Sequence, residues 1–230
     1  MNTQSPSTSP LSSPITTVLG PVPISEIGVT DAHSHLWIDP VASAAEGSPV
    51  LTGYAEILAE LADYRRAGGS AVVDCQPGGC GRNGERLIQL AQASGIYVIA
   101  CTGFHRTRYY APDFWLWQST PQQAGEYFLS ELRLGLAETR TLKSPALAGF
   151  IKVACEAVLS QTPPAALEGA AIAAAESGCA VEIHTERGQD AENIVAFFER
   201  HGVPLQQVVL CHMDKRPDVG LHRELAGAGV

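Results

Sequence analysis

Short apolar runs rich in β-branched residues alternate with longer amphipathic segments from residue 29 to the end of the chain. The short runs are bounded by Gly, Pro or polar residues and predict buried strands, whereas the longer segments repeat apolar residues with the period of a helix. The predicted strands cover residues 29–36, 71–75, 96–101, 148–153, 180–184 and 208–212. The predicted helices cover approximately residues 53–67, 83–95, 120–136, 164–177, 190–198 and 218–227. The pattern therefore predicts six strand–helix units in a row.

Regular alternation of strands and helices favours an α/β fold with a parallel sheet and helices outside it. A TIM-type (β/α) barrel and a doubly wound open sheet both satisfy that pattern. An open sheet usually places its ligands at one or two switch points, whereas the candidate ligands here follow the first, fourth, fifth and sixth predicted strands. We therefore predict a TIM-type (β/α) barrel over residues 25–230. We expect this barrel to be truncated, because only six units are predicted and a complete barrel has about eight.

The composition fits one domain: the chain has 230 residues, of which 45% are hydrophobic, and its formal net charge is -9. An acidic protein of this kind has no electrostatic reason to bind nucleic acid or an anionic membrane. No apolar run reaches the length of a membrane span. We expect a cytoplasmic protein that acts on a small-molecule substrate, with a homodimer among the assemblies that the sequence allows.

Residues 1–24 are rich in Ser, Thr and Pro and predict a disordered leader. No basic residue precedes an apolar core in this segment, so we do not expect a signal peptide. Five of the six cysteines lie in or beside predicted strands, which predicts buried thiols in a reducing compartment rather than disulfides. Cys80 lies in a Gly-rich loop and is expected to be structurally idle, with a reactive or metal-binding role as the less favoured alternative.

Four histidines and one lysine stand at the ends of predicted strands: His33, His35, Lys152, His184 and His212. The carboxyl ends of parallel strands meet on one face of a barrel, so these side chains are expected to converge. His33 and His35 project to the same side of their strand and can chelate one cation, while His184 and His212 can hold a second. The pattern predicts a site for two divalent cations, which promote hydrolysis because bound water ionises near neutral pH.

Lys152 lies within an apolar run, where an unpaired ammonium is very costly. It therefore needs a partner of opposite charge or a chemical change. Reaction with CO₂ would turn the amine into a carbamate, whose two anionic oxygens can bridge two cations as a carboxylate does. Any one of the histidines alone is more often a structural residue than a ligand. The ordered set of five residues favours the metal site.

Four segments resemble the phosphotriesterase family of the amidohydrolase superfamily: His33-Ser-His35, Gly149-Phe-Ile-Lys152, Glu182-Ile-His184-Thr185-Glu-Arg-Gly188 and Leu210-Cys-His212-Met-Asp214. The resemblance covers about residues 25–230. It implies a binuclear centre, usually zinc, in which His33 and His35 bind one metal and His184 and His212 the other. Carboxylated Lys152 would bridge the two metals and serve as the catalytic lysine. The family's last ligand, an aspartate after the eighth strand, has no counterpart among these residues.

Cationic side chains gather in two loops that follow predicted strands and would lie at the mouth of the barrel. The predicted substrate-binding residues are Arg106, Arg108, Tyr109, Lys215 and Arg216. Arg and Lys side chains suit a phosphate or carboxylate on the substrate, although surface salt bridges would explain them equally well. The segment from Thr102 to Tyr110 also resembles family members that open phosphorylated sugar lactones. We therefore expect hydrolysis of an anionic (phospho)sugar lactone. The alternatives are an aryldialkylphosphate (phosphotriester) hydrolase, a metal-dependent DNase or amidohydrolase, and an inactive fragment.

Overall fold

A computed structural model describes residues 14–42 and 44–230 and has one six-stranded sheet at its centre. The strands follow one another in chain order: β3 (Val29–Ser34), β4 (Gly69–Asp74), β5 (Tyr97–Gly103), β6 (Phe150–Ala154), β7 (Val181–His184) and β8 (Val208–Cys211). Each strand pairs in parallel with the next one. Each also overlaps a strand predicted from the sequence, so the α/β class with a parallel sheet is confirmed.

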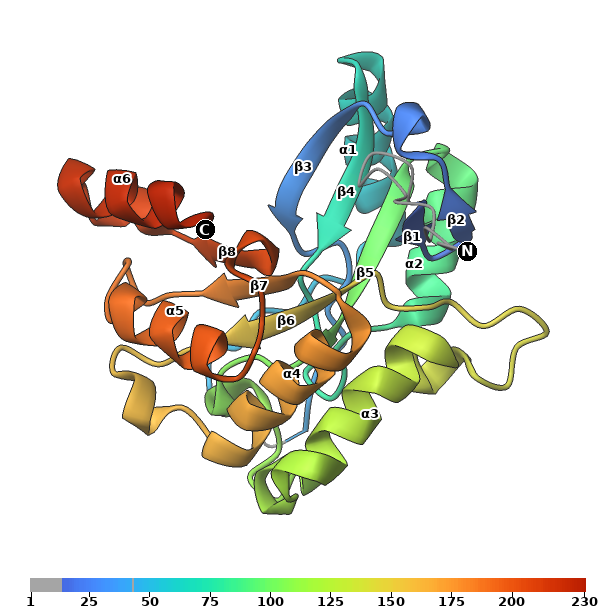
Figure 1. The fold of residues 1–230 in the computed structure, drawn as a ribbon. Helices are drawn as coiled ribbons and strands as arrows, with labels where there is room; N and C mark the ends of the chain where they lie inside the picture. Colours follow the sequence, from blue (N-terminus) through green and yellow to red (C-terminus); the bar gives the residue numbers. More distant parts are fainter. Residues whose placement is uncertain (1–13, 43) are drawn as a thin grey trace, which may run out of the picture.

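The connecting helices lie along the outer face of the curved sheet (Figure 1). They are α1 (Tyr54–Arg66), α2 (Gly84–Ser94), α3 (Pro121–Arg133), α4 (Pro164–Ser177) and α5 (Ala191–Arg200), and α6 (Val219–Ala228) follows the last strand. The apolar core between helices and sheet forms two main clusters, one with α1 and α2 against β4 and β5, the other with α3, α4 and α5 against β6, β7 and β8. Within the described part of the chain, β3 and β8 are edge strands. The sheet is thus an open half-barrel of the TIM type.

The predicted disordered leader is wrong for residues 14–24; residues 1–13 lie outside the described residues. Ile15–Thr17 (β1) and Gly20–Val22 (β2) form a two-stranded antiparallel ribbon. Between them Val18 is 4% exposed, and its backbone N–H donates to the Val98 carbonyl of β5 at 2.9 Å. The polar composition of the segment concealed this one apolar anchor, which packs into the core between α2 and the sheet.

In the described ranges, none of the helices combines the length and the apolar character needed to cross a membrane.

Candidate metal centre

The predicted ligands come together at the carboxyl edge of the sheet. His33 lies in β3, Lys152 in β6 and His184 at the end of β7, while His35 and His212 directly follow β3 and β8. The ring centre of His33 lies 5.8 Å from that of His35 and 5.0 Å from that of His212, and the His184 and His212 rings are 4.7 Å apart. The convergence follows from the parallel arrangement of the strands, as the sequence pattern predicts.

The backbone supports this convergence at two unusual positions. His212 has the left-handed φ of 65°, which costs a residue with a side chain roughly 1–2 kcal/mol. Gly103, at the end of β5, has a φ of 106°, and a Cβ there would lie 1.9 Å from the carbonyl oxygen of Lys152. The next residue, Phe104, donates its N–H to that same oxygen at 2.9 Å. Only glycine allows β5 to approach Lys152 this closely.

Three of the four histidines face an acceptor with one ring nitrogen. Nδ1 of His35 is 2.7 Å from Oε1 of Gln76, and Nε2 of His184 is 2.8 Å from Oε1 of Glu186. Nδ1 of His33 is 2.6 Å from Oε1 of Glu182, in a close contact that departs from ideal hydrogen-bond alignment. An acceptor holds the proton on the nitrogen that it contacts, so the other ring nitrogen offers its lone pair. This is the arrangement that metal-binding histidines have in proteins.

The protonation of these histidines also suits metal binding. Burial lowers the pKa of His35 to about 4, and burial likewise lowers the pKa of His184. Burial, with smaller contributions from His184 and His33, lowers the pKa of His212 to about 4. These imidazoles are therefore neutral at pH 7, which is the form that binds metals. The chemistry of these donors therefore fits divalent cations.

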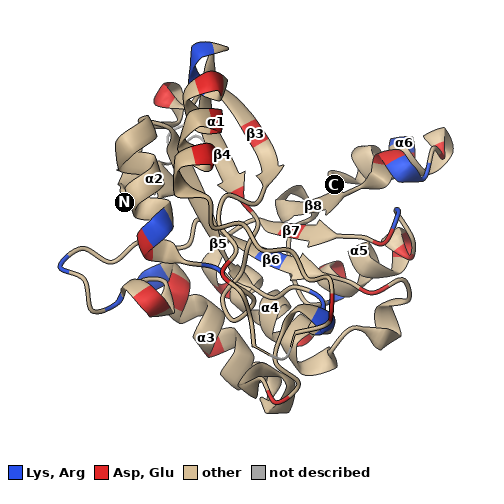
Figure 2. Ribbon diagram, turned by 180° about the vertical axis from the view of Figure 1, so that it is seen from behind, with Lys and Arg blue, Asp and Glu red and all other residues tan. Residues whose placement is uncertain are grey.

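Lys152 is fully buried, and it has a partner of opposite charge that the sequence analysis missed. Its Nζ lies 3.1 Å from Oε1 of Glu182 on the neighbouring strand β7. Figure 2 shows a basic position on β6 and an acidic position on the neighbouring strand β7. The signal was available, because Glu182 stands two residues before His184 and must project from the same face of the strand. The ion pair with Glu182 is thus one way to accommodate this lysine, and a carbamate is the other.

The same oxygen of Glu182 also accepts hydrogen bonds from two thiols, Cys75 Sγ at 3.1 Å and Cys211 Sγ at 3.2 Å. Burial alone would raise the pKa of Glu182, but His33 and Lys152 outweigh it and lower that pKa to about 2. Burial raises the pKa of Cys211 to about 12, so its thiol stays protonated. The ligand atoms of His33, Glu182 and Cys211 lie within 4.8 Å of one another, which makes Glu182 a candidate for direct contact with a cation.

A fifth histidine, His105, joins the group from the loop after β5. Its ring centre is 6.1 Å from that of His35 and 5.8 Å from that of His184. Burial, together with the nearby Lys152 and the neighbouring histidines, lowers its pKa to about 2. The sequence analysis assigned no role to this histidine, because no spacing rule connects it to the strand-end motif.

Comparison with known proteins agrees with this geometry. The model of the phosphotriesterase family matches residues 13–230. The chain belongs to the phosphotriesterase family. A phospho-furanose lactonase of Mycoplasmopsis agalactiae is 28% identical over 221 residues, which cover 89% of this chain and 61% of that protein. The chain thus spans less than two thirds of the length of this curated relative.

Two solved structures of family relatives share the fold. A lactonase from Listeria monocytogenes superimposes with a TM-score of 0.84 at 20% identity, covering 95% of this chain and 70% of that one. An amidohydrolase from Mycoplasma synoviae gives a TM-score of 0.85 at 25% identity, covering 95% and 65%. Phosphotriesterase-family proteins typically hold two metals.

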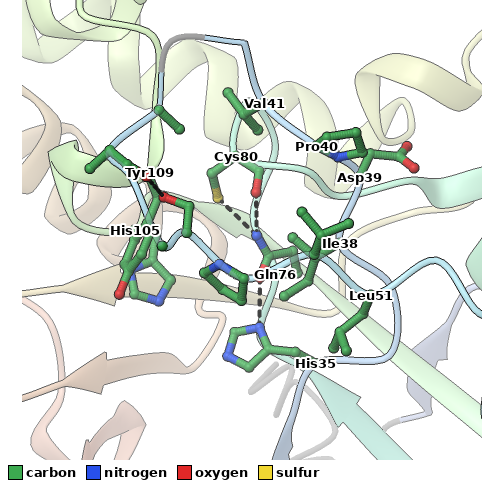
Figure 3. Close-up of a pocket in the computed structure, with 16 residues that line it drawn as sticks. His35, Ile38, Asp39, Pro40, Val41, Leu51, Gln76, Cys80, His105 and Tyr109 are labelled. Carbon is green, nitrogen blue, oxygen red and sulfur yellow. Dashed lines mark hydrogen bonds between the residues drawn. The ribbon is translucent and has the colours of Figure 1, made fainter.

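A cavity of about 460 Å³ opens beside His35 and His105 (Figure 3). The loop between β3 and α1 forms most of its wall, largely with apolar side chains such as Ile38, Val41 and Leu51. This loop is tied to the loop after β5, because Ala45 N–H donates to the Arg108 carbonyl at 2.9 Å. The cavity gives a small molecule a mainly apolar place next to the histidines.

Two of the five predicted substrate-binding residues form ion pairs with carboxylates of the protein itself. Arg106 pairs with Glu156 and Glu186 at 2.7 Å each, and Arg216 pairs with Glu192 at 2.9 Å. Arg108 instead lies over the ring of Tyr109, its guanidinium carbon 5.4 Å from the ring centre, and Tyr109 itself lines the cavity. Within the described ranges, neither Arg108 nor Lys215 has a carboxylate at ion-pair distance.

Cys80, which was predicted to be a structurally idle thiol in a Gly-rich loop, is buried and only 2% exposed. Its carbonyl accepts a hydrogen bond from Nε2 of Gln76 at 2.5 Å. That bond fixes the orientation of the Gln76 amide, whose oxygen faces His35. Asp74 has a related role: its carboxylate accepts the N–H groups of Leu36 at 2.8 Å and Gln76 at 2.9 Å.

Proposed function

We propose that this protein is a metal-dependent hydrolase that opens the ring of an anionic sugar lactone, with zinc as its metal. The observation that carries the proposal is the convergence of His33, His35, His184 and His212 above Lys152, beside a cavity large enough for a small molecule. The name of the M. agalactiae relative, a phospho-furanose lactonase, supports a phosphorylated lactone as the substrate class.

In this proposal each part of the site has a distinct task. His33 and His35 would hold one cation and His184 and His212 the other, with Lys152 between the pairs as the bridging carbamate. Two such cations would supply an activated water and polarise the lactone carbonyl. The cavity wall formed by the loop between β3 and α1 would orient the ring. Arg108 and Lys215 would attract the anionic group, since Arg106 and Arg216 are already paired with carboxylates.

The substrate class is tested by assaying the zinc-loaded chain with phosphorylated sugar lactones, unphosphorylated sugar lactones and paraoxon-like esters. We expect a preference for the phosphorylated lactones that falls in the Arg108→Ala and Lys215→Ala variants, mainly through a higher KM. Arg133→Ala, which removes an exposed ion pair with Glu176 away from the site, is the matched control. A preference for neutral esters would favour the alternative of phosphotriester hydrolysis and contradict the anionic substrate.

The bridging role of Lys152 has a separate test that needs no substrate. A carbamate forms from CO₂, so bicarbonate should increase the zinc affinity of the wild type and leave that of Lys152→Ala unchanged. Lys152→Glu should retain part of the zinc binding, because it restores an anionic group. Equal zinc binding by wild type and Lys152→Ala would contradict the bridge.

A further inference from the structure

His105 completes a ring of five neighbouring imidazoles. The ring runs from His33 to His35, His105, His184, His212 and back to His33, with centre-to-centre distances of 5.8, 6.1, 5.8, 4.7 and 5.0 Å. His105 lies between one member of each predicted metal-binding pair. It also lines the cavity, as His35 does (Figure 3). A molecule in that cavity would therefore meet His105 beside the metal-binding histidines.

Three contacts hold the His105 side chain and its backbone. The ring nitrogen Nδ1 accepts a hydrogen bond from the backbone N–H of Arg106 at 2.7 Å, and the backbone N–H of His105 donates to the hydroxyl of Tyr110 at 2.9 Å. The ring packs edge-to-face against Tyr109 with centres 4.7 Å apart. Tyr110 is itself only 2% exposed. The orientation of the imidazole is therefore set by the loop and does not depend on a ligand.

The ring of His105 faces a hydrogen-bond donor, whereas three of the other histidines face an acceptor. His33, His35 and His184 each contact an oxygen acceptor, which leaves a lone pair on the second ring nitrogen. His105 contacts a donor, the Arg106 N–H, so the lone pair of Nδ1 is already used. A neutral imidazole carries one proton, and here it must be on Nε2. The group that His105 presents is thus an N–H, whereas a metal ligand must present a lone pair.

We propose that His105 is a catalytic hydrogen-bond donor whose Nε2–H binds the carbonyl oxygen of the ester or lactone held in the cavity, and that it is not a metal ligand. The inference rests on the proposed hydrolytic function. Negative charge develops on the carbonyl oxygen when water adds to the carbonyl carbon, and a preoriented N–H stabilises that charge more than it stabilises the neutral substrate. Loss of one such donor lowers kcat by about 100-fold to 1,000-fold in other hydrolases.

The protonation pattern can be tested without turnover. In ¹⁵N-histidine NMR spectra of the full chain, zinc should shift the signals of the four predicted ligands, while His105 keeps its proton on Nε2 and its acceptor Nδ1. Addition of a γ-lactam, which presents a carbonyl oxygen but resists hydrolysis, should then shift the Nε2–H signal of His105. Loss of that proton on zinc binding, or no response to the lactam, would overturn the proposal.

Kinetic variants give a second, independent readout. His105→Ala should keep the zinc content of the wild type and lose about 100-fold in kcat on any ester that the wild type hydrolyses, with a small change in KM. His105→Gln, whose amide can donate a hydrogen bond, should recover part of the loss. His201→Gln, at the end of α5, is the control. A fall in zinc content in His105→Ala would show that His105 is a metal ligand and would contradict the proposal. An inactive wild type would contradict the proposed function, and the NMR result would still decide the role of His105.

Discussion

One oxygen atom, Oε1 of Glu182, contacts two of the residues predicted to bind metal. It contacts His33 from β3 and Lys152 from β6, and two thiols complete its surroundings. A buried charge is tolerated only where such partners exist, and removal of one partner leaves the other uncompensated. Glu182 is therefore as important to the site as the histidines, whether it orients His33 or contacts a cation directly.

Glu182→Gln should weaken zinc binding by about 10-fold to 100-fold, since His33 loses the carboxylate that orients it. The variant should also unfold more readily, by about 3 kcal/mol, because Lys152 stays buried without its counter-charge. Competition with a chromogenic chelator measures the first effect, and urea unfolding of the metal-free protein measures the second. Glu192→Gln, which removes an exposed ion pair with Arg216, is the control and should change neither quantity. Zinc affinity equal to that of the wild type would show that Glu182 has no part in the centre.

The buried histidines make the stability of the metal-free protein depend on pH. The folded-state pKa values of His35 and His105 lie near 4 and 2, below the ordinary value of 6.5. The unfolded chain therefore binds more protons, so the contribution of these residues to stability is complete above pH 6.5 and is lost as the pH falls towards 4. Melting temperatures in EDTA should decrease over this range, and His105→Gln should show a shallower decrease. An equally steep decrease in that variant would contradict the assignment.

At the scale of elements, close contacts between neighbouring strands and strong helix caps position the site. Thr120 and Gln123 form a capping box at the start of α3, and the side chains of Asn83 and Asp218 cap α2 and α6. Asp190 precedes α5 but does not cap it with its side chain, because its carboxylate accepts the N–H of Leu159 at 2.6 Å. The decisive contact for the site is the approach of β5 to β6 at Gly103.

Gly103→Ala should destabilise the protein by more than about 3 kcal/mol, because its Cβ would overlap the Lys152 carbonyl and its φ of 106° disfavours any side chain. Gly202→Ala is a matched control: its φ of 78° is also left-handed, but nothing lies within 4 Å of the added Cβ. The control should cost about 1 kcal/mol. Urea unfolding measures both, and similar losses in the two variants would show that the contact with Lys152 is unimportant.

At the scale of the whole molecule, the described sheet has two edges where a closed barrel has none. Val29 at the start of β3 and Val209 in β8 are 66% and 49% exposed. Exposed edge strands with apolar side chains promote association between chains, and charged side chains on an edge oppose it. An open half-barrel of this kind is therefore expected to self-associate.

Val209→Lys should reduce self-association of the chain, measured by sedimentation velocity over a range of protein concentrations. Val158→Lys is the control, because Val158 is also 49% exposed but lies outside the sheet. Equal self-association of the wild type and the Val209→Lys variant would exclude β8 as the associating edge. A wild type that is monomeric at every concentration would contradict the expectation for both edges.

The alternation of strands and helices and the positions of His33, His35, Lys152, His184 and His212 at one edge of the sheet could be predicted from the sequence alone. Both depend on local periodicity and on the rule that parallel strands end on the same side. Glu182 was open to the same reasoning, since it shares a face of β7 with His184.

Only the tertiary structure decided which atoms those side chains face. Glu182 is 30 residues from Lys152, and Gln76 is 41 residues from His35, so sheet register and loop path determine these pairs. The same holds for the ion pairs that Arg106 and Arg216 form with carboxylates. Composition alone could not show that these two arginines are paired and therefore less available to a substrate. His105 enters the site because a loop anchored by Tyr110 places it there. Contacts between distant segments have no periodicity along the chain, and therefore they appear only when the chain is folded.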